Sequence, residues 1–405
     1  MLDVLFLSRL IPKDLDDEVR ANMINFMNDA AIAWQEHIIT GLDANLENPV
    51  KLINLLPIAS YPLHYKKPFI KTCKFSHRKD ATDINVGFCN IRYIKRFIQG
   101  KNLYHEVANW AKTDDGRKKV IISYTLYPEF MEAVRRAISI NPDIIANAIV
   151  LDLPKYTILQ KKISIGSKLY LHWSAKKAKK RLSFFDCFTL LTEQMADALE
   201  LTQPYTIVEG ICTEEFPKVE KRKDNRKVVF YAGTLHERFG VLNLIKAFKY
   251  IKGNDYRLVI CGFGDSQNEI QNASKEDNRI EFLGQLPRNE VLKHMLSASV
   301  IVNPRGNTEE FVKYSFPSKN MEGLSSGIPF IGYKLAGIPK EYDDYMNYPE
   351  DETVFSLAKK IKEVCEDVNG IYIKKAELAK KWVIDKKNPR VQAEKMLTLI
   401  KGVKK

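Results

Sequence analysis

The sequence predicts an α/β protein of two domains, each with a parallel sheet covered by helices on both faces. The chain has 405 residues, which is too long for one typical hydrophobic core. In its second half, short strand-like runs alternate with helical patterns, as in successive βαβ units. Between the halves, the eleven residues Pro217–Lys227 hold eight charges and one aliphatic side chain. Such a segment cannot be buried, so we expect a solvated connection there.

The second half shows the alternation most clearly. Its expected strands are Val228–Ala232, Tyr256–Cys261, Ile280–Leu283, Val300–Asn303 and Pro329–Gly332. The expected helices between them are Val241–Ile251, Asp265–Ala273 and Asn289–Ser297. Helices of this length between strands predict right-handed crossovers and a parallel sheet.

The first half repeats the pattern less regularly. Its expected strands are Val4–Leu7, Lys51–Leu55, Val120–Ser123 and Ala148–Leu151, and its expected helices are Asn22–Ile39, Ile91–Trp110 and Pro128–Ile140. We therefore place an N-terminal domain at residues 1–210, a linker at 211–227, a second domain at 228–385 and a terminal helix at 386–405. The helical stretch Ala376–Val403 is broken at Asn388-Pro389, and the sequence leaves open which domain the last helix joins.

The composition indicates a globular protein of the cytoplasm. Hydrophobic residues make up 45% and charged residues 28%, and no run approaches the roughly 18 apolar residues that span a bilayer. The first residues predict a buried strand with Asp3 inside it, not a signal peptide. The cysteines are scattered without metal-ligand spacing, so we expect reduced core thiols and no metal site: Cys73, Cys89, Cys187, Cys212, Cys261 and Cys365.

The net charge of +13 predicts an anionic binding partner, and the position of the basic residues in the sequence indicates which kind of partner. Two segments of the first half combine basic and aromatic residues, Tyr65–Lys79 and Lys161–Phe185. This combination suits the interface of an anionic membrane. We therefore expect a peripheral location on the inner face of the plasma membrane; simply solvated lysines remain the alternative.

Loops at strand ends in the second half carry the candidate ligand residues, because open α/β sheets bind ligands there. After the first of these strands come Gly233 and Thr234, where a ligand can approach the backbone, and Arg238, a forked donor for phosphate. An ordinary loop with a solvated arginine is equally compatible. Gly262 and Phe263 follow the next strand, but their Gly-Phe-Gly sequence lacks the third glycine of a dinucleotide fingerprint.

The strongest candidate site follows the strand Val300–Asn303. Arg305 at that strand's end is expected to face the ligand, or else it points to solvent. Beyond it, Ser315 is expected to cap a short helix with Pro317 in its first turn and Gly327 at its end. The helix start would bind an anion, and Lys319 adds a full charge. Glu322 shares a face with Ser318 and can accept hydrogen bonds from a ribose diol; a plain capped helix is the alternative.

The residues Tyr314-Ser-Phe-Pro-Ser-Lys-Asn-Met-Glu322 with Gly327-Ile-Pro resemble the nucleotide-sugar motif of GT-B glycosyltransferases of family 4, also called glycosyl transferases group 1. The resemblance is nearest to the enzymes of bacterial capsular and other surface polysaccharides. It extends to Tyr231-Ala-Gly with Phe239-Gly240, Leu191–Met195, Ile207–Gly210 and Asp152-Leu-Pro154.

The resemblance implies a hexosyl-type transferase that retains anomeric configuration and needs no metal or other cofactor. Its second domain would bind a nucleotide diphosphate-sugar, and its first would hold a lipid-linked glycan acceptor. The fold implied is two Rossmann-like domains with parallel sheets that face each other across a cleft. Glu322 would bind the ribose, Phe316–Lys319 the phosphates, and Gly233 would line that cleft. Two positions depart from the family. A frequent glutamate is replaced by Tyr314, for which Glu309 or Glu310 would have to substitute. Lysine before Gly240 is replaced by Phe239, so Arg238 or Lys319 would supply that charge.

The expected chemistry is electrostatic, with donors and cations stabilising the leaving diphosphate. Asp152, at a strand end, is a candidate acceptor-side carboxylate, or else it caps the turn at Leu153-Pro154. The rival functions are a sugar-nucleotide epimerase or a phosphorylase of the same fold, an inactive binding subunit, and a basic nucleic-acid-binding protein. The last has no recognisable module here, so we expect no nucleic acid as partner. The donor base, sugar, acceptor and linkage stay open.

Overall fold

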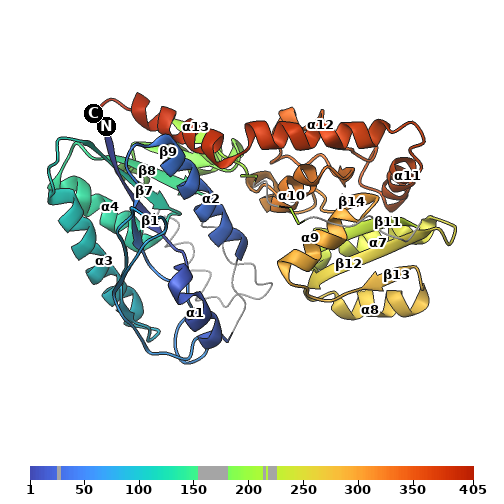
Figure 1. Cartoon of the computed structure of the whole chain (residues 1–405), viewed down its shortest axis with the longest axis horizontal. Coiled ribbons are helices and arrows are strands. Elements are labelled where there is room, and N and C mark those ends of the chain that lie inside the picture. The colour runs from blue at the N-terminus through green and yellow to red at the C-terminus, as the bar shows by residue number, and fades with distance from the viewer. Residues whose placement is uncertain (25–28, 154–180, 213–215, 218–225) are drawn as a thin grey trace. The chain divides into compact units, whose positions relative to one another are not determined.

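The computed structural model describes residues 1–24, 29–153, 181–212, 216–217 and 226–405. These residues divide into two compact units, Met1–Ile211 with Pro389–Lys405, and Cys212–Asn388 (Figure 1). The C-terminal segment therefore belongs to the first unit. Pro389 removes a backbone donor and begins a new helix. The long terminal stretch is accordingly two helices, α12 (Ile371–Lys386) and α13 (Pro389–Gly402).

The first unit is built on one sheet whose described strands run in the order β10-β9-β8-β7-β1-β2-β5-β4. They are β1 (Leu2–Ser8), β2 (Lys51–Asn54), β4 (Cys73–Phe75), β5 (Asp83–Asn85), β7 (Lys118–Tyr124), β8 (Ile145–Val150), β9 (Cys187–Leu190) and β10 (Tyr205–Ile207). All pairings are parallel except that of β4 with β5. The central strands are buried on both faces, as expected for a sheet covered by helices on each side.

Helices cover both faces of this sheet (Figure 1). Here α2 (Asp29–Asn45) packs with α13 on one side, and α3 (Lys95–Lys112) packs with α4 (Pro128–Ile140) on the other. The described part of this unit also contains two short helices, α1 (Asp16–Asn22) and α6 (Gln194–Leu199). A separate two-stranded ribbon joins β3 (Phe69–Ile70) to β6 (Phe88–Cys89), antiparallel.

The second unit has a parallel sheet in the order β13-β12-β11-β14-β15. Its strands are β11 (Lys227–Thr234), β12 (Tyr256–Phe263), β13 (Ile280–Phe282), β14 (Val300–Asn303) and β15 (Phe330–Gly332). The helices that accompany them are α7 (Val241–Tyr250), α8 (Gln267–Glu276), α9 (Arg288–Leu296), α10 (Ser318–Ser326), α11 (Val354–Cys365) and α12. The predicted α/β class is confirmed. The order reverses between β11 and β14, and such a switch point is where doubly wound sheets bind ligands.

Two helix predictions in the first unit were wrong at their boundaries. The helix expected at Asn22–Ile39 is interrupted, because Met23 is extended and pairs with Tyr65 in an isolated antiparallel bridge. The helix expected from Ile91 begins only at Lys95, since Ile91 pairs with Tyr61. Both errors have one cause: a non-local backbone pairing overrides local helix propensity.

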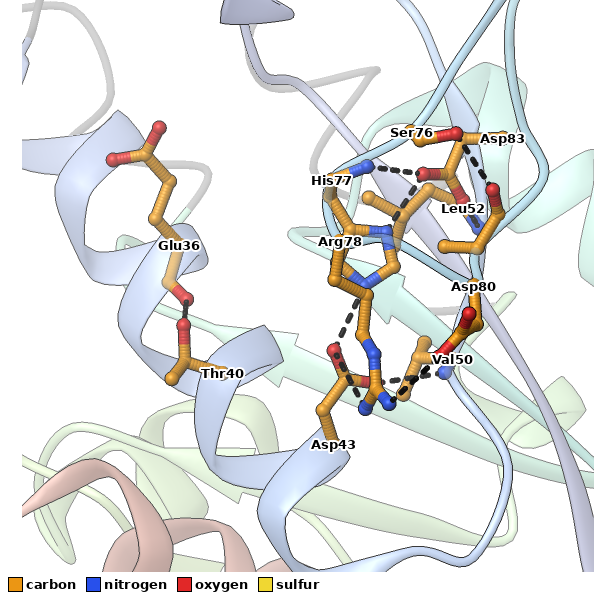
Figure 2. Close-up of polar contacts among 11 residues, drawn as sticks. Glu36, Thr40, Asp43, Val50, Leu52, Ser76, His77, Arg78, Asp80 and Asp83 are labelled. Atoms are coloured by element: carbon orange, nitrogen blue, oxygen red, sulfur yellow. Dashed lines mark hydrogen bonds and ion pairs between the residues drawn. The ribbon is translucent and has the colours of Figure 1, made fainter.

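A buried ion cluster fixes the loop between β4 and β5 (Figure 2). His77 Nδ1 lies 2.7 Å from Asp83 Oδ2, and His77 Nε2 lies 2.8 Å from Asp43 Oδ2 on α2. The remaining carboxylate oxygens accept the N–H groups of Leu52 and Val50. Burial opposes protonation, but the hydrogen bonds to both aspartates outweigh it and raise the pKa of His77 to about 9. This cluster ties the loop to the sheet and to α2.

No helix among the described residues is long and apolar enough to span a membrane.

Candidate functional site

The candidate site of the second unit gathers at the edge where β11, β12 and β14 end. In the register of the sheet, Gly233 lies opposite Gly262, and Thr234 opposite Phe263. Gly262 has φ +141°, and a Cβ there would lie 1.9 Å from the Gly233 carbonyl oxygen, so this close approach requires glycine. Phe263 leaves the sheet with 53% of its surface exposed. The glycines predicted for ligand approach therefore do lie side by side.

The α10 helix reaches the same edge, although it begins later than predicted. Pro317 is its extended N-cap residue, and the helix itself starts at Ser318. Ser315 is not an N-cap, which corrects the expectation: it follows the 3-10 turn Glu310–Tyr314 and its Oγ accepts a hydrogen bond from Arg305 Nη2 at 2.7 Å. The physical reason is Pro317, because the residue before a proline is driven out of the helical region.

Phe316 has a structural environment that the sequence analysis did not anticipate. Its ring is buried, with its centroid 5.3 Å from that of Tyr342. The side chain thus belongs to the core and holds the start of α10 in place, so any contact of Phe316 with a ligand would be through its backbone.

Glu322, one turn into α10, lies between two cations. Its Oε2 is 3.0 Å from Lys319 Nζ, and its Oε1 is 3.1 Å from Arg288 Nη1. Burial opposes ionisation of the carboxyl, but Lys319 and Arg288 outweigh it and hold the pKa of Glu322 below its ordinary value. Glu322 is therefore a fixed, ionised acceptor, whose lone pairs not used by these two cations can receive further hydroxyl donors.

Arg288 is a site residue that sequence reasoning missed. It is the first residue of α9, directly after Pro287 in the loop that follows β13. Because all strands of this sheet are parallel, that loop also opens on the ligand edge. The predicted parallel topology could have indicated Arg288, because it puts the loop after this strand at the ligand edge. Arg288 itself belongs to no motif.

A pair of arginines forms the most unusual feature of the edge. Arg305 follows β14, and Arg238 lies in the loop after β11; both lie against the rings of Phe239 and Phe311, at 4.9–5.9 Å from the ring centroids. Gly240 makes this possible, since a Cβ there would lie 2.0 Å from the Pro304 carbonyl oxygen. Its φ of +82° is also one that glycine adopts at no cost.

The arginine pair has little charge compensation. Among the described residues neither guanidinium has a carboxylate partner, and the buried Nε of Arg305 has no hydrogen-bond acceptor. Burial, together with the charge of Arg238, lowers the pKa of Arg305 to about 10. The group remains charged at neutral pH. Two like charges that share an aromatic surface without a counter-ion form a strong site for a multivalent anion.

Lys319 connects the two parts of this edge. Its Cε lies 3.8 Å from the position a Cβ on Gly233 would take, so its chain runs from α10 toward the end of β11. Of the predicted residues, the structure brings together Gly233, Thr234, Arg238, Gly262, Phe263, Arg305, Ser315, Lys319 and Glu322 at one edge of the second unit.

Three predicted residues are placed differently. Asp152 follows β8 in the first unit, where it is exposed, and the Leu153-Pro154 turn runs into residues that the structure does not describe. Glu310 lies 3.9 Å from Lys313, and Glu309 is the residue before the 3-10 turn; both are exposed. Within the described residues, no group of three or more His, Cys, Asp or Glu is placed to hold a metal ion.

Comparison with known proteins assigns the second unit. The family model described as "Glycosyl transferases group 1" matches residues 213–383, nearly the whole of this unit. No curated protein matches the sequence of the chain.

Solved structures assign the fold. The chain is similar to sucrose-phosphate synthase from Thermosynechococcus elongatus, with 15% identity, a TM-score of 0.63 and coverage of 99% of this chain and 98% of that one. It is similar to the α,α-trehalose-phosphate synthase (UDP-forming) from Burkholderia xenovorans, with 10% identity, a TM-score of 0.62 and coverage of 99% and 100%. It also resembles Anabaena HepE in complex with UDP, with 12% identity, a TM-score of 0.59 and coverage of 98% and 99%.

The protein is thus a glycosyltransferase enzyme of the GT-B fold, and its second unit carries a glycosyl transferases group 1 domain.

Proposed function

We propose that the enzyme transfers a sugar from a nucleotide diphosphate-sugar, which binds at the ligand edge of the second unit. The observation that carries this proposal is the arginine pair, which has no carboxylate partner among the described residues, at the same edge as an ionised Glu322. A nucleoside diphosphate offers both complements, a multivalent anion for the cations and a ribose diol for the carboxylate. HepE, which has the same fold, is described in complex with UDP.

In this proposal the diphosphate lies between Lys319, Arg238 and Arg305, near the start of α10. When the bond between the sugar and the diphosphate breaks, negative charge develops on the leaving phosphate oxygen. Side chains already held in place stabilise that charge without reorganisation, and removing one such donor typically costs about 10²–10³ in rate. These residues neutralise the diphosphate through their own charge, so the proposal includes neither a metal nor another cofactor.

The finer assignment extends to the acceptor. We propose a family 4 enzyme that retains anomeric configuration and glycosylates a lipid-linked glycan during the synthesis of a capsular or other surface polysaccharide. The acceptor would bind the first unit near Asp152, and the enzyme would work in the cytoplasm, peripherally on the inner face of the plasma membrane. The basic and aromatic residues of Tyr65–Lys79 support the location; most of Lys161–Phe185 lies outside the described residues.

A thermal-shift series with UDP, GDP, dTDP and CMP and their sugars tests the donor site. The correct nucleotide should raise the melting temperature by mass action. Glu322→Ala should abolish that shift, whereas Glu276→Ala, which changes an exposed carboxylate at the end of α8, should leave it intact. A sugar nucleotide isomerised without transfer would identify an epimerase. If no nucleotide raises the melting temperature, and Glu322→Ala leaves sugar transfer unaffected, the proposed site is excluded.

A further inference from the structure

The first unit presents a set of exposed apolar side chains that its fold does not use. Tyr93, Phe97 and Phe69 are exposed at 85%, 76% and 67% of their surface. With three aliphatic neighbours they form what we call the platform: Leu63, Phe69, Ile91, Tyr93, Ile94 and Phe97. Single exposed apolar residues are ordinary, but six of them on paired segments indicate an interaction surface.

Backbone pairing holds the platform together. The β3–β6 ribbon pairs Phe69 with Cys89, and Tyr61 forms a bridge with Ile91. Asn90 strengthens the junction, since its N–H donates to the Pro68 carbonyl at 2.7 Å and its carbonyl accepts the N–H of Tyr61 at 3.0 Å. The two segments that carry the platform are therefore fixed next to each other, and the start of α3 continues from them.

The start of α3 has inverted polarity. Lys95 is only 8% exposed, and its ammonium donates to the Ile58 carbonyl at 2.6 Å, whereas Phe97, two residues later, points outward. A helix packed only against its own sheet would bury the phenylalanine and expose the lysine. The exposure of Phe97 therefore does not follow from the packing needs of the unit.

The surroundings of the platform are cationic. Residues 61–76 and 88–101, which contain all of the platform, hold eight Lys or Arg, all exposed except Lys95, and no Asp or Glu. Lys67 meets Glu18 at 2.7 Å and Arg96 meets Glu129 at 3.9 Å, both from other segments. Two copies of such a surface would repel each other. Leu63, Ile91 and Ile94 do not stack on bases, but they insert readily among acyl chains.

We propose that the platform is the surface by which this protein docks on an anionic lipid bilayer, with its apolar side chains among the acyl chains and the surrounding lysines and arginines at the headgroups. The loop that carries Leu63 follows the C-terminal end of β2, the edge at which parallel sheets bind ligands. The platform gives a surface to the peripheral location in the proposed function, but it rests on residues of the first unit alone. Delivery of a lipid-linked acceptor at this surface rests on the proposed function.

The platform overlaps only in part with Tyr65–Lys79, the segment that the sequence indicated as a membrane contact. Within Tyr65–Lys79, Tyr65 and Phe75 are buried, and His77 and Arg78 face aspartates. That segment contributes Phe69 and the exposed lysines Lys66, Lys67, Lys71 and Lys74. Tyr93, Ile94 and Phe97 come from a segment that the sequence did not connect with a membrane.

Vesicle flotation of the full chain tests the proposal. The protein should float with phosphatidylcholine vesicles that contain phosphatidylserine, less with neutral vesicles, and less as salt is raised. The double variant Tyr93→Ser with Phe97→Ser should reduce binding roughly tenfold. A matched control, Ile373→Ser with Leu378→Ser, removes two exposed apolar side chains from α12 and should float like the wild type.

Several outcomes would overturn the proposal: no flotation at low salt, equal binding to neutral vesicles, or a platform variant that floats like the wild type. A change of oligomeric state in that variant without loss of flotation would instead indicate an interface between copies. Melting temperature and its shift by UDP should be unchanged in both variants, because neither touches the core or the donor site. That readout distinguishes failure of the docking surface from failure of the proposed donor site.

Discussion

His77 in the first unit and Arg305 in the second are both largely enclosed cations, and they are compensated in opposite ways. His77 lies between Asp43 and Asp83, at 2.8 and 2.7 Å. Arg305 has beside it Arg238, two phenylalanine rings and the Ser315 hydroxyl. Within the described residues, the charge of His77 is balanced by carboxylates, whereas that of Arg305 is not. The first cluster therefore stabilises the fold, while the second is completed only when an anion binds.

Replacement of Arg305 should give the largest effect. Arg305→Met removes a cation that has no carboxylate partner in the described part of the chain and that would stabilise the leaving diphosphate, so we expect transfer to fall by about 10²–10³. The free energy of unfolding without nucleotide should stay constant or rise, because an unsatisfied buried Nε is removed. Steady-state kinetics and thermal unfolding measure the two effects. Arg279→Met is the control: that arginine pairs with Asp277 at 2.7 Å, so its loss should lower stability and spare transfer.

If the Arg305→Met protein is less stable but still binds nucleotide normally, Arg305 stabilises the fold and not the ligand. The contrast with His77 would then not hold.

The His77 cluster should make stability depend on pH. The folded-state pKa of about 9 exceeds the ordinary value of 6.5, so the stabilisation is complete below pH 6.5 and is lost as pH rises through about 9. The contribution is on the order of 3 kcal/mol. Urea unfolding over this range should show it for the wild type, and His77→Gln should flatten the curve. His105→Gln, which changes an exposed histidine, should leave it unchanged. A wild-type curve without slope between these pH values would contradict the compensation described here.

Glu322→Gln tests the negative member of the donor site. The variant keeps the shape but loses the charge between Lys319 and Arg288, so nucleoside diphosphate should bind about tenfold more weakly. Inorganic pyrophosphate, which has no ribose, should bind as well as before or better. Calorimetric titration with both ligands separates the two. Equal weakening of both would mean that Glu322 only orders the cations.

An exposed ion pair gives the baseline for these effects. Lys249 on α7 meets Glu276 on α8 at 2.9 Å, with both side chains about half exposed or more. Lys249→Ala should change the free energy of unfolding by about 0.5 kcal/mol or less, because solvent screens such pairs. A larger loss of unfolding free energy, measured with urea, would show that the surface charges of this protein are coupled. The effects at His77 and Arg305 could then not be treated as independent.

Local patterns predicted the sheet of the second unit well. The strand Val300–Asn303 was predicted at its observed bounds, and the other four strands shifted by three residues or fewer at their ends. Buried strands of a parallel sheet are continuous apolar runs, so their signal does not depend on distant residues. The short ribbon strands β3 and β6 escaped prediction, since two residues carry no periodicity and gain their structure from each other.

The candidate site was predictable in its motif residues but not in its partners. Glu322, Lys319 and Gly233 stood out because residue type and spacing mark them. Arg288 did not, since only the parallel sheet brings the loop after β13 to the same edge. Ser315 was predicted as a helix cap from spacing alone. Because Pro317 moves the start of the helix to Ser318, Ser315 instead accepts a hydrogen bond from Arg305.

The sequence by itself determined the two-part α/β class, the loops that carry ligand residues and the short helix with Lys319 and Glu322. These depend on periodicity and on residues near one another in the chain. Only the tertiary structure decided that Arg238 and Arg305 share two rings with no carboxylate from the described residues, and that His77 lies between two carboxylates. It also decided that Phe97 faces outward while Lys95 is buried. Charge compensation and exposure depend on which distant segments meet, and local spacing does not encode those meetings.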